Sequence, residues 1–222
     1  MPLCHHYTTL KEFFPYLYLT KTKSTLLKIG ITGGIGSGKT IVCKMFEILG
    51  IPVYYADERA KWLTNTDLQL RKEIKELLGR QAYDEKGQYN RKWVASQVFD
   101  NPELLKMLNA LIHPRVFADT DQWFLQHQDK PYTLREAALM NAAGDNNDFD
   151  AVVLVSAPVD IRIARIRKRD PQRTEEEIKA IIDRQKTEEQ FASIANYTII
   201  NDDEHLLIPQ VLVLHKKLSI QT

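Results

Sequence analysis

The sequence predicts a three-layer α/β fold with a parallel five-stranded sheet, a helical insertion and a lid. Three observations predict it. The first two strand-like runs enclose a glycine-dense turn and a helical pattern, which is the order of a right-handed parallel βαβ unit. A long helical stretch without strand character follows, over about residues 60–128. Short apolar runs typical of buried strands occur five times, at residues 26–32, 51–55, 133–140, 151–155 and 194–200.

Length and composition fit one substantial domain. The 222 residues are 44% hydrophobic, and the formal charge of +1 lacks the basic excess of a nucleic-acid or membrane-surface protein. No apolar run approaches the roughly 20 residues that a spanning helix needs. Cys4 and Cys43 lie far apart and indicate neither a disulfide framework nor a metal cluster. We therefore expect a cytoplasmic protein that binds neither nucleic acid nor membranes.

Residues 1–25 precede the first strand and differ from the rest of the chain. They lack the long apolar centre of a secretory signal and the arginines of a mitochondrial presequence. We interpret them as an N-terminal extension outside the fold. A further hypothesis places the natural start at Leu26 or Leu27, and a Met1 peptide in the native protein would exclude it. The aromatic residues of this extension are Phe13, Phe14, Tyr16 and Tyr18.

The turn after the first strand carries the main functional motif. Residues 33–40 read Gly-Gly-Ile-Gly-Ser-Gly-Lys-Thr and fit the phosphate-loop pattern G-x-x-x-x-G-K-[ST] in full. Glycines let the backbone N–H groups point at phosphate oxygens, and the helix that starts near Lys39 adds its positive dipole end. Lys39 should bridge the β- and γ-phosphates of ATP, and the Thr40 hydroxyl should bind Mg²⁺. The alternative is a glycine-rich turn with an incidental lysine. The predicted nucleotide-binding residues here are Gly34, Ile35, Gly36, Ser37, Gly38, Lys39, Thr40 and Ile41.

Most of the chain after the phosphate loop shows the apolar spacing of helices. A helix at residues 40–49 ends at Gly50, and the insertion shows helical patterns at residues 68–78, 93–99, 102–112 and 116–126. Residues 160–190 are charged and helical with a break at Pro171, and residues 204–218 form an amphipathic helix.

An arginine-rich run at the start of the charged segment predicts a lid. A small kinase must surround the transferring phosphoryl group with positive charge and exclude water. The alternative is a solvated helix face that three following glutamates balance. There is no Asn-Lys-x-Asp segment to read guanine, and the strand at 151–155 ends in Ser-Ala-Pro without the carboxylates of motors and transporters. These features favour a P-loop kinase fold. The run comprises Arg162, Arg165, Arg167, Lys168, Arg169 and Arg173.

Beyond these motifs, the sequence after Leu26 resembles the dephospho-coenzyme A kinase family. The His-Pro and Arg-Asp pairs are more specific to that family than the loop itself. The matching segments are the phosphate loop, Leu49-Gly50-Ile51-Pro52-Val53, Ala56-Asp57, Ile112-His113-Pro114-Arg115-Val116, Arg165 with Arg169-Asp170 and Gln185, and the stretch from Ala195 to Asn201.

The resemblance implies transfer of the ATP γ-phosphoryl group to the ribose 3′-hydroxyl of dephospho-coenzyme A. We expect a monomer or weak homo-oligomer, and the resemblance implies a chain divided into three parts. These are a nucleotide-binding core (26–60, 132–159 and 193–222), a helical insertion that binds the acceptor (61–131) and a lid (160–192).

The resemblance also assigns residue roles. Asp57, with Lys39 and Arg165, is expected in catalysis, where its carboxylate accepts the hydroxyl proton and orients the oxygen. The alternative for Asp57 is a helix N-cap. Arg165 and Arg169 would contact ATP phosphates or stack on adenine.

Three further residues complete the expected site. Asn201 would bind the nucleotide. Lys61 and His113 would contact the acceptor together with Asp57. A histidine before a proline at a helix junction is as often structural as functional, so both interpretations of His113 stay open.

Several positions depart from the family pattern. Ile41 stands where a Thr is usual, and Tyr55 replaces the first Asp of an Asp-Ala-Asp segment. The family's Pro-Leu-Leu-Phe-Glu segment is Ala-Ala-Leu-Met-Asn-Ala here, with Ala142 in place of the Glu, and Gln190 replaces a Lys. Glu136 is an alternative carboxylate at a different spacing. Two other functions therefore stay open: a P-loop nucleoside or metabolite kinase with an altered acceptor, and a non-catalytic nucleotide-binding regulator.

Overall fold

The computed structural model describes residues 26–137 and 148–220. Its strands are β1 (Leu27–Thr32), β2 (Val53–Tyr55), β3 (Tyr132–Glu136), β4 (Ala151–Ser156) and β5 (Tyr197–Ile200). Its helices are α1 (Lys39–Ile48), α2 (Ala56–Thr66), α3 (Leu68–Leu78), α4 (Arg91–Val98), α5 (Pro102–Leu125), α6 (Val159–Arg169), α7 (Glu175–Asp183), α8 (Glu188–Ile194) and α9 (Leu207–Ile220), with a short 3-10 helix η2 (Arg80–Ala82).

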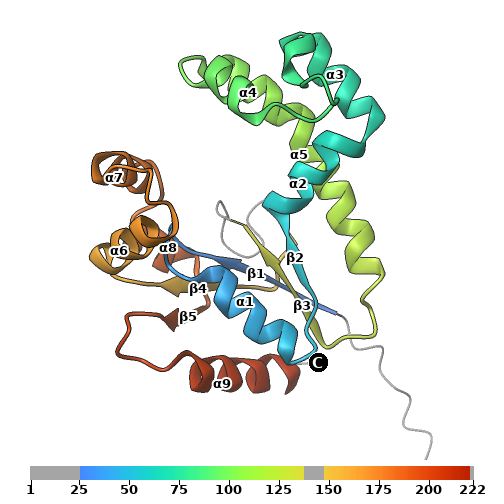
Figure 1. Ribbon diagram of the computed structural model, residues 1–222. Helices are drawn as coiled ribbons and strands as arrows, with labels where there is room; N and C mark the ends of the chain where they lie inside the picture. Colours follow the sequence, from blue (N-terminus) through green and yellow to red (C-terminus); the bar gives the residue numbers. More distant parts are fainter. Residues whose placement is uncertain (1–25, 138–147, 221–222) are drawn as a thin grey trace, which may run out of the picture.

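The five strands form one parallel sheet in the order β2-β3-β1-β4-β5 (Figure 1). This arrangement confirms the predicted fold class. Because all strands run the same way, their carboxyl ends lie at one edge, where ligands of open α/β sheets bind. The phosphate loop follows β1 at this edge, α2 follows β2, and α6 follows β4 after a short connection. The topology therefore brings distant segments of the chain to one place.

Each face of the sheet is covered by helices. On one face, Ile29 and Ile31 of β1 pack in a cluster with Val42 and Phe46 of α1 and with Leu214 of α9. The opposite face is covered by a second hydrophobic cluster, in which residues of β2 and β4 pack against residues of α2, α3, α4 and α5. The sheet thus lies between two helical layers. None of the helices in the described ranges is long and apolar enough to cross a membrane.

Helix α5 differs from the prediction of two helices at residues 102–112 and 116–126. It is one helix of 24 residues with Pro114 inside it. Proline lacks an N–H group and removes one helical hydrogen bond, so a break was expected. Packing decides otherwise, because Leu108 before Pro114 and Val116 and Phe124 after it are all buried in the same cluster. Tertiary contacts therefore keep the helix continuous across the proline.

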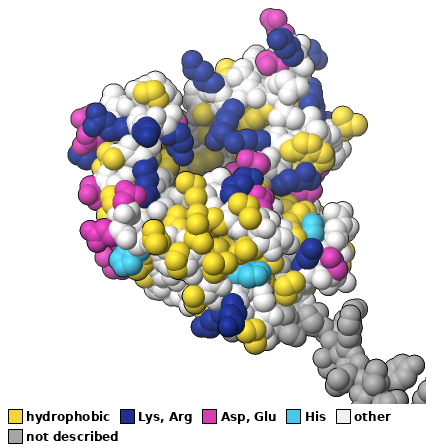
Figure 2. Space-filling model, turned by 60° about the horizontal axis from the view of Figure 1, so that its bottom comes forward, with side chains coloured by type: hydrophobic (Ala, Val, Ile, Leu, Met, Phe, Trp, Pro, Cys, Tyr) yellow, Lys and Arg dark blue, Asp and Glu magenta, His cyan; other side chains and the backbone are white. Residues whose placement is uncertain are grey.

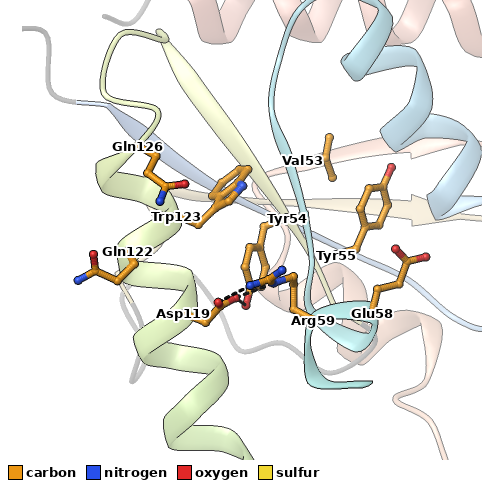
Figure 3. Close-up of a pocket in the computed structure, with 9 residues that line it drawn as sticks. All are labelled: Val53, Tyr54, Tyr55, Glu58, Arg59, Asp119, Gln122, Trp123 and Gln126. Carbon is orange, nitrogen blue, oxygen red and sulfur yellow. Dashed lines mark hydrogen bonds and ion pairs between the residues drawn. The ribbon is translucent and has the colours of Figure 1, made fainter. Parts of the chain in front are cut away.

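A polar network anchors α5 to the edge of the sheet. The Asp119 carboxylate of α5 accepts hydrogen bonds from Arg59 Nε (2.8 Å) and Nη2 (2.5 Å) and from the Tyr54 hydroxyl (2.6 Å). Figure 3 shows these side chains in a pocket of about 270 Å³ between β2, α2 and α5. The bonds from Arg59, and then that from Tyr54, hold the pKa of Asp119 below its usual value although burial opposes them. The network ties the helical insertion to β2.

We expect Asp119→Asn to lower the free energy of unfolding by about 1–3 kcal/mol, because partly buried charged hydrogen bonds are lost. The lowered pKa of Asp119 means that its contribution is complete above the unfolded carboxyl pKa of about 4 and is lost as the pH falls through the folded value. Urea unfolding at pH 7 and at pH 3 tests this. Asp129→Asn is the matched control, since the Asp129 side chain is 71% exposed. Equal effects of the two variants at pH 7 would contradict the anchoring role.

Candidate functional site

The phosphate loop at residues 33–40 needs glycine for two reasons. Gly33, Gly36 and Gly38 have φ of 147°, 79° and 94°, a region that favours glycine. The loop also packs closely against its neighbours. A Cβ atom on Gly33 would lie 2.3 Å from the Val155 carbonyl oxygen, and one on Gly38 would lie 2.1 Å from Asn201 Nδ2. The glycine pattern is therefore set by the surrounding structure as well as by the turn.

Arg162 of α6 lies directly against this loop. Its Nε donates a hydrogen bond to the Ile35 carbonyl oxygen (2.9 Å), and a Cβ atom on Gly34 would meet Arg162 Nη2 at 2.2 Å. Arg162 is 4% exposed, and this burial lowers its pKa while the charge of Glu188 opposes the shift. A buried guanidinium thus borders the loop.

Lys39 begins α1 and folds back over the loop. Its Nζ donates to the carbonyl oxygens of Gly33 (2.8 Å) and Gly34 (3.3 Å). Burial lowers the pKa of Lys39, while the charges of Glu136 and Asp57 oppose that shift. The ammonium group therefore lies within the field of two carboxylates, one at the end of β3 and one just after the end of β2.

These two carboxylates have different surroundings. Glu136 ends β3, where its Cα pairs with Ile31 and with Tyr55, and it is 9% exposed. Burial raises the pKa of Glu136, and Lys39 opposes the rise. Asp57 is exposed and lies in the first turn of α2, whose N-cap residue is Tyr55. Asp57 is thus not the N-cap residue, although an acidic side chain in the first turn still interacts favourably with the positive end of the helix dipole.

On the other side of the loop, Asn201 joins it to α6. The buried Asn201 side chain donates from Nδ2 to the Ser37 carbonyl oxygen (2.7 Å) and accepts from Arg165 Nη2 (3.1 Å). Arg165 also donates to Asp203 (2.5 Å). The structure thus brings two predicted nucleotide-binding residues together beside the loop. Arg169, one turn further along α6, is exposed and pairs with Asp170 instead.

The remaining predicted residues lie around this centre. Thr40 and Ile41 are exposed in the first turn of α1, and the Thr40 hydroxyl makes no hydrogen bond within the described chain. Lys61 is exposed on α2, one turn beyond Asp57. His113 is exposed on α5 and borders a groove of about 560 Å³. No hydrogen bond among the described residues joins His113 to the loop. Ala142 and its segment beyond Ala137 lie outside the described residues.

Two features of the site were not predicted from the sequence. Arg162 was counted only as one member of the arginine-rich run, and nothing in the spacing distinguishes it from Arg165. Gln185 was noted as a family match without a role, yet its Oε1 accepts a hydrogen bond from the Ile35 N–H (2.8 Å). A loop glutamine carries no signal of that contact, because 150 residues separate the two partners.

A glycine-lined loop between β1 and α1, a folded-back lysine and an arginine-bearing segment beside them define a P-loop kinase. Comparisons with known proteins agree with this class. Residues 27–206 match the family model described as dephospho-CoA kinase. Proteins named dephospho-CoA kinase are 37% identical in Bacteroides fragilis, over 85% of this chain and 91% of that protein, and 36% identical in Porphyromonas gingivalis, over 84% and 92%.

Solved structures share the fold. The crystal structure of TT1252 from Thermus thermophilus is 27% identical and has a TM-score of 0.76, covering 87% of this chain and 97% of that one. The dephospho-CoA kinase from Campylobacter jejuni has a TM-score of 0.58 at 20% identity, with the same coverage. The chain belongs to the dephospho-CoA kinase family. Membership of this family favours the prediction of a dephospho-coenzyme A kinase over the two alternatives, a kinase with an altered acceptor and a non-catalytic nucleotide-binding regulator.

We expect Gly38→Ala to weaken ATP binding more than about tenfold, because the methyl group would displace Asn201 and distort the loop in addition to straining a positive φ. Calorimetric titration with ATP measures this. Gly50→Ala is the matched control, since Gly50 has a similar φ of 81° but no atom within 4 Å of the added Cβ. If Gly38→Ala bound ATP as tightly as the Gly50→Ala protein, the close approach would have no functional meaning.

Proposed function

We propose that this chain transfers the γ-phosphoryl group of ATP to the ribose 3′-hydroxyl of dephospho-coenzyme A, giving coenzyme A and ADP. The observation that carries the proposal is the meeting of the phosphate loop, Lys39 and the Asp57 carboxylate at one edge of the sheet in a member of this family. The names of the relatives support the acceptor, since each is called a dephospho-CoA kinase.

On the donor side, the loop binds the ATP phosphates. Its backbone N–H groups and the start of α1 supply the donors, and Lys39 exchanges its two carbonyl partners for β- and γ-phosphate oxygens. The exposed Thr40 hydroxyl is free of protein partners in the described chain and suits Mg²⁺, which kinases bind through few protein oxygens and the phosphates. Bound Mg²⁺ supplies positive charge to the reacting phosphates. Arg165 and Asn201 face the same loop from the side of β5.

On the acceptor side, Asp57 orients the hydroxyl and accepts its proton. We propose that the insertion (61–131), including Lys61 and His113, holds the acceptor and that residues 160–192 form the lid. The insertion and the lid segment rise on opposite sides of the loop (Figure 1). Figure 2 shows a hollow between the two lobes with Lys and Arg side chains around it, which suits an acceptor that carries phosphates.

One contact already crosses from the lid segment to the insertion. The Arg184 guanidinium, just after α7, lies 5.4 Å from the ring centroid of Phe99 at the end of α4. A lid that meets the insertion in this way would exclude water from the transfer site and suppress ATP hydrolysis. We place the reaction in the cytoplasm, because Cys43 is a buried free thiol and the sequence indicates no disulfide framework.

A coupled ADP-release assay with Mg-ATP, with and without dephospho-coenzyme A, tests the function. We expect acceptor-dependent ADP release and a product with the mass of coenzyme A. Lys39→Ala should lose most of this turnover, which shows that the activity belongs to this site. ADP release at the same rate with and without dephospho-coenzyme A would contradict the proposal. ADP release that persists in Lys39→Ala would also contradict it.

For Asp57 we expect Asp57→Asn to lower kcat by about 10²–10⁴-fold, the usual contribution of a positioned acid or base, with ATP affinity changed by less than about threefold. Single-turnover kinetics and ATP titration separate the two effects. Glu58→Gln is the matched control, because Glu58 also lies in the first turn of α2. Similar small losses in both variants would mean that Asp57 acts only on the helix dipole.

A further inference from the structure

A side chain of the lid segment occupies part of the phosphate loop. Gln185, between α7 and α8, accepts two hydrogen bonds at Oε1, from the Ile35 N–H (2.8 Å) and from Arg162 Nη2 (3.1 Å). The first donor belongs to the loop and the second to α6. One oxygen of the lid segment therefore accepts hydrogen bonds from two donors that lie side by side at the loop.

These donors are the kind that bind phosphate. Backbone N–H groups of such loops serve phosphate oxygens, and a guanidinium is a preferred partner of the phosphate group. The amide oxygen of Gln185 stands where a phosphate oxygen would accept the same two bonds. The bond from the Arg162 guanidinium is already charge-assisted, and a phosphate oxygen would add an opposite charge to it and make the bond from the neutral Ile35 N–H charge-assisted as well. A phosphate oxygen would thus compete well against this amide oxygen.

The position corresponds to the outer end of a bound triphosphate. The inner phosphates belong at the start of α1, near Gly38, where the helix dipole is positive. Lys39, which should bridge the β- and γ-phosphates, points its Nζ at the carbonyl oxygens of Gly33 and Gly34. Ile35 directly follows those residues. The N–H of Ile35 is therefore nearer to the terminal phosphate than to the inner ones.

Arg162 is held in place and lacks an anion. It is 4% exposed, its Nε is fixed on the Ile35 carbonyl oxygen, and within the described chain it forms no ion pair with a carboxylate within 4 Å. The carboxylate whose charge acts on it, Glu188, bonds to the Ser156 hydroxyl instead. A buried cation without a close counter-ion is costly, and binding an anion beside it removes that cost. Arg165 differs, because it is paired with Asp203.

We propose that Arg162 and the Ile35 N–H form a subsite for the γ-phosphoryl group of ATP, which Gln185 occupies without nucleotide and leaves when ATP binds. The proposal rests on the proposed function only in taking ATP as the donor. ADP has no γ-phosphate and leaves Gln185 in place. Because Gln185 lies between α7 and α8, its release lets that part of the lid segment move. The lid segment thereby distinguishes ATP from ADP.

Titration of three variants with ADP and with a non-hydrolysable ATP analogue tests the subsite. Arg162→Gln should weaken analogue binding by about 10–100-fold, as expected for a lost charged hydrogen bond, and change ADP binding by less than about threefold. Gln185→Ala should tighten analogue binding severalfold and leave ADP binding unchanged. Arg167→Gln is the control on the same helix, because the Arg167 side chain is 62% exposed and pairs with Glu175.

The ratio of the affinity for the ATP analogue to the affinity for ADP tests the subsite, since a purely structural role of Arg162 would weaken the binding of both ligands alike. Equal weakening of analogue and ADP in Arg162→Gln would overturn the subsite, and an unchanged ratio in Gln185→Ala would overturn the competition. Gln185→Ala keeps the test valid if Arg162→Gln does not fold. These titrations contain no acceptor, so they can succeed even if dephospho-coenzyme A is not the substrate.

Discussion

The site depends on the close approach of the phosphate-loop backbone to three neighbouring segments. The loop lies against the Val155 carbonyl at the end of β4, against Arg162 of α6 and against Asn201 after β5. No side chain fits at these approaches, so the glycines are fixed by the neighbours as well as by the turn. The order β2-β3-β1-β4-β5 makes this possible, because it places β1 between β3 and β4. The strand order therefore brings together the segments that fix the loop geometry.

Within this frame, positive charge is buried before any substrate arrives. Lys39 and Arg162 both have their pKa lowered by burial, and in the described chain both rely mainly on backbone carbonyls and the neutral Gln185 for hydrogen bonds. Glu136 offsets part of this charge but carries a raised pKa of its own. Within the described residues, neither cation forms an ion pair with a carboxylate within 4 Å. On the proposed function, the phosphates of ATP would pair with both cations, which would offset the cost of burying them and favour a polyphosphate ligand.

The sequence reveals those parts of the fold that are local in the chain. The loop pattern, the five strand-like runs and the charged helical stretch after β4 could be found because each is a continuous stretch with its own pattern. Long-range packing decided the rest. Helix α5 continues through Pro114 because both halves bury residues in one cluster, and Arg162 rather than Arg165 meets the loop because of how α6 is rotated against it. Neither outcome follows from residue type or spacing.

The insertion and the lid segment are attached to the core in different ways, and this difference matters for catalysis. Helix α5 is anchored by a buried apolar cluster and by the bonds of Asp119 to Arg59 and Tyr54. Gln185, by contrast, holds the stretch between α7 and α8 to the loop by hydrogen bonds that a ligand can replace. Apolar packing resists displacement, whereas exchangeable polar contacts follow occupancy. The insertion, which we propose holds the acceptor, is therefore the firmly attached part, and the stretch between α7 and α8 is the part that phosphate binding could release.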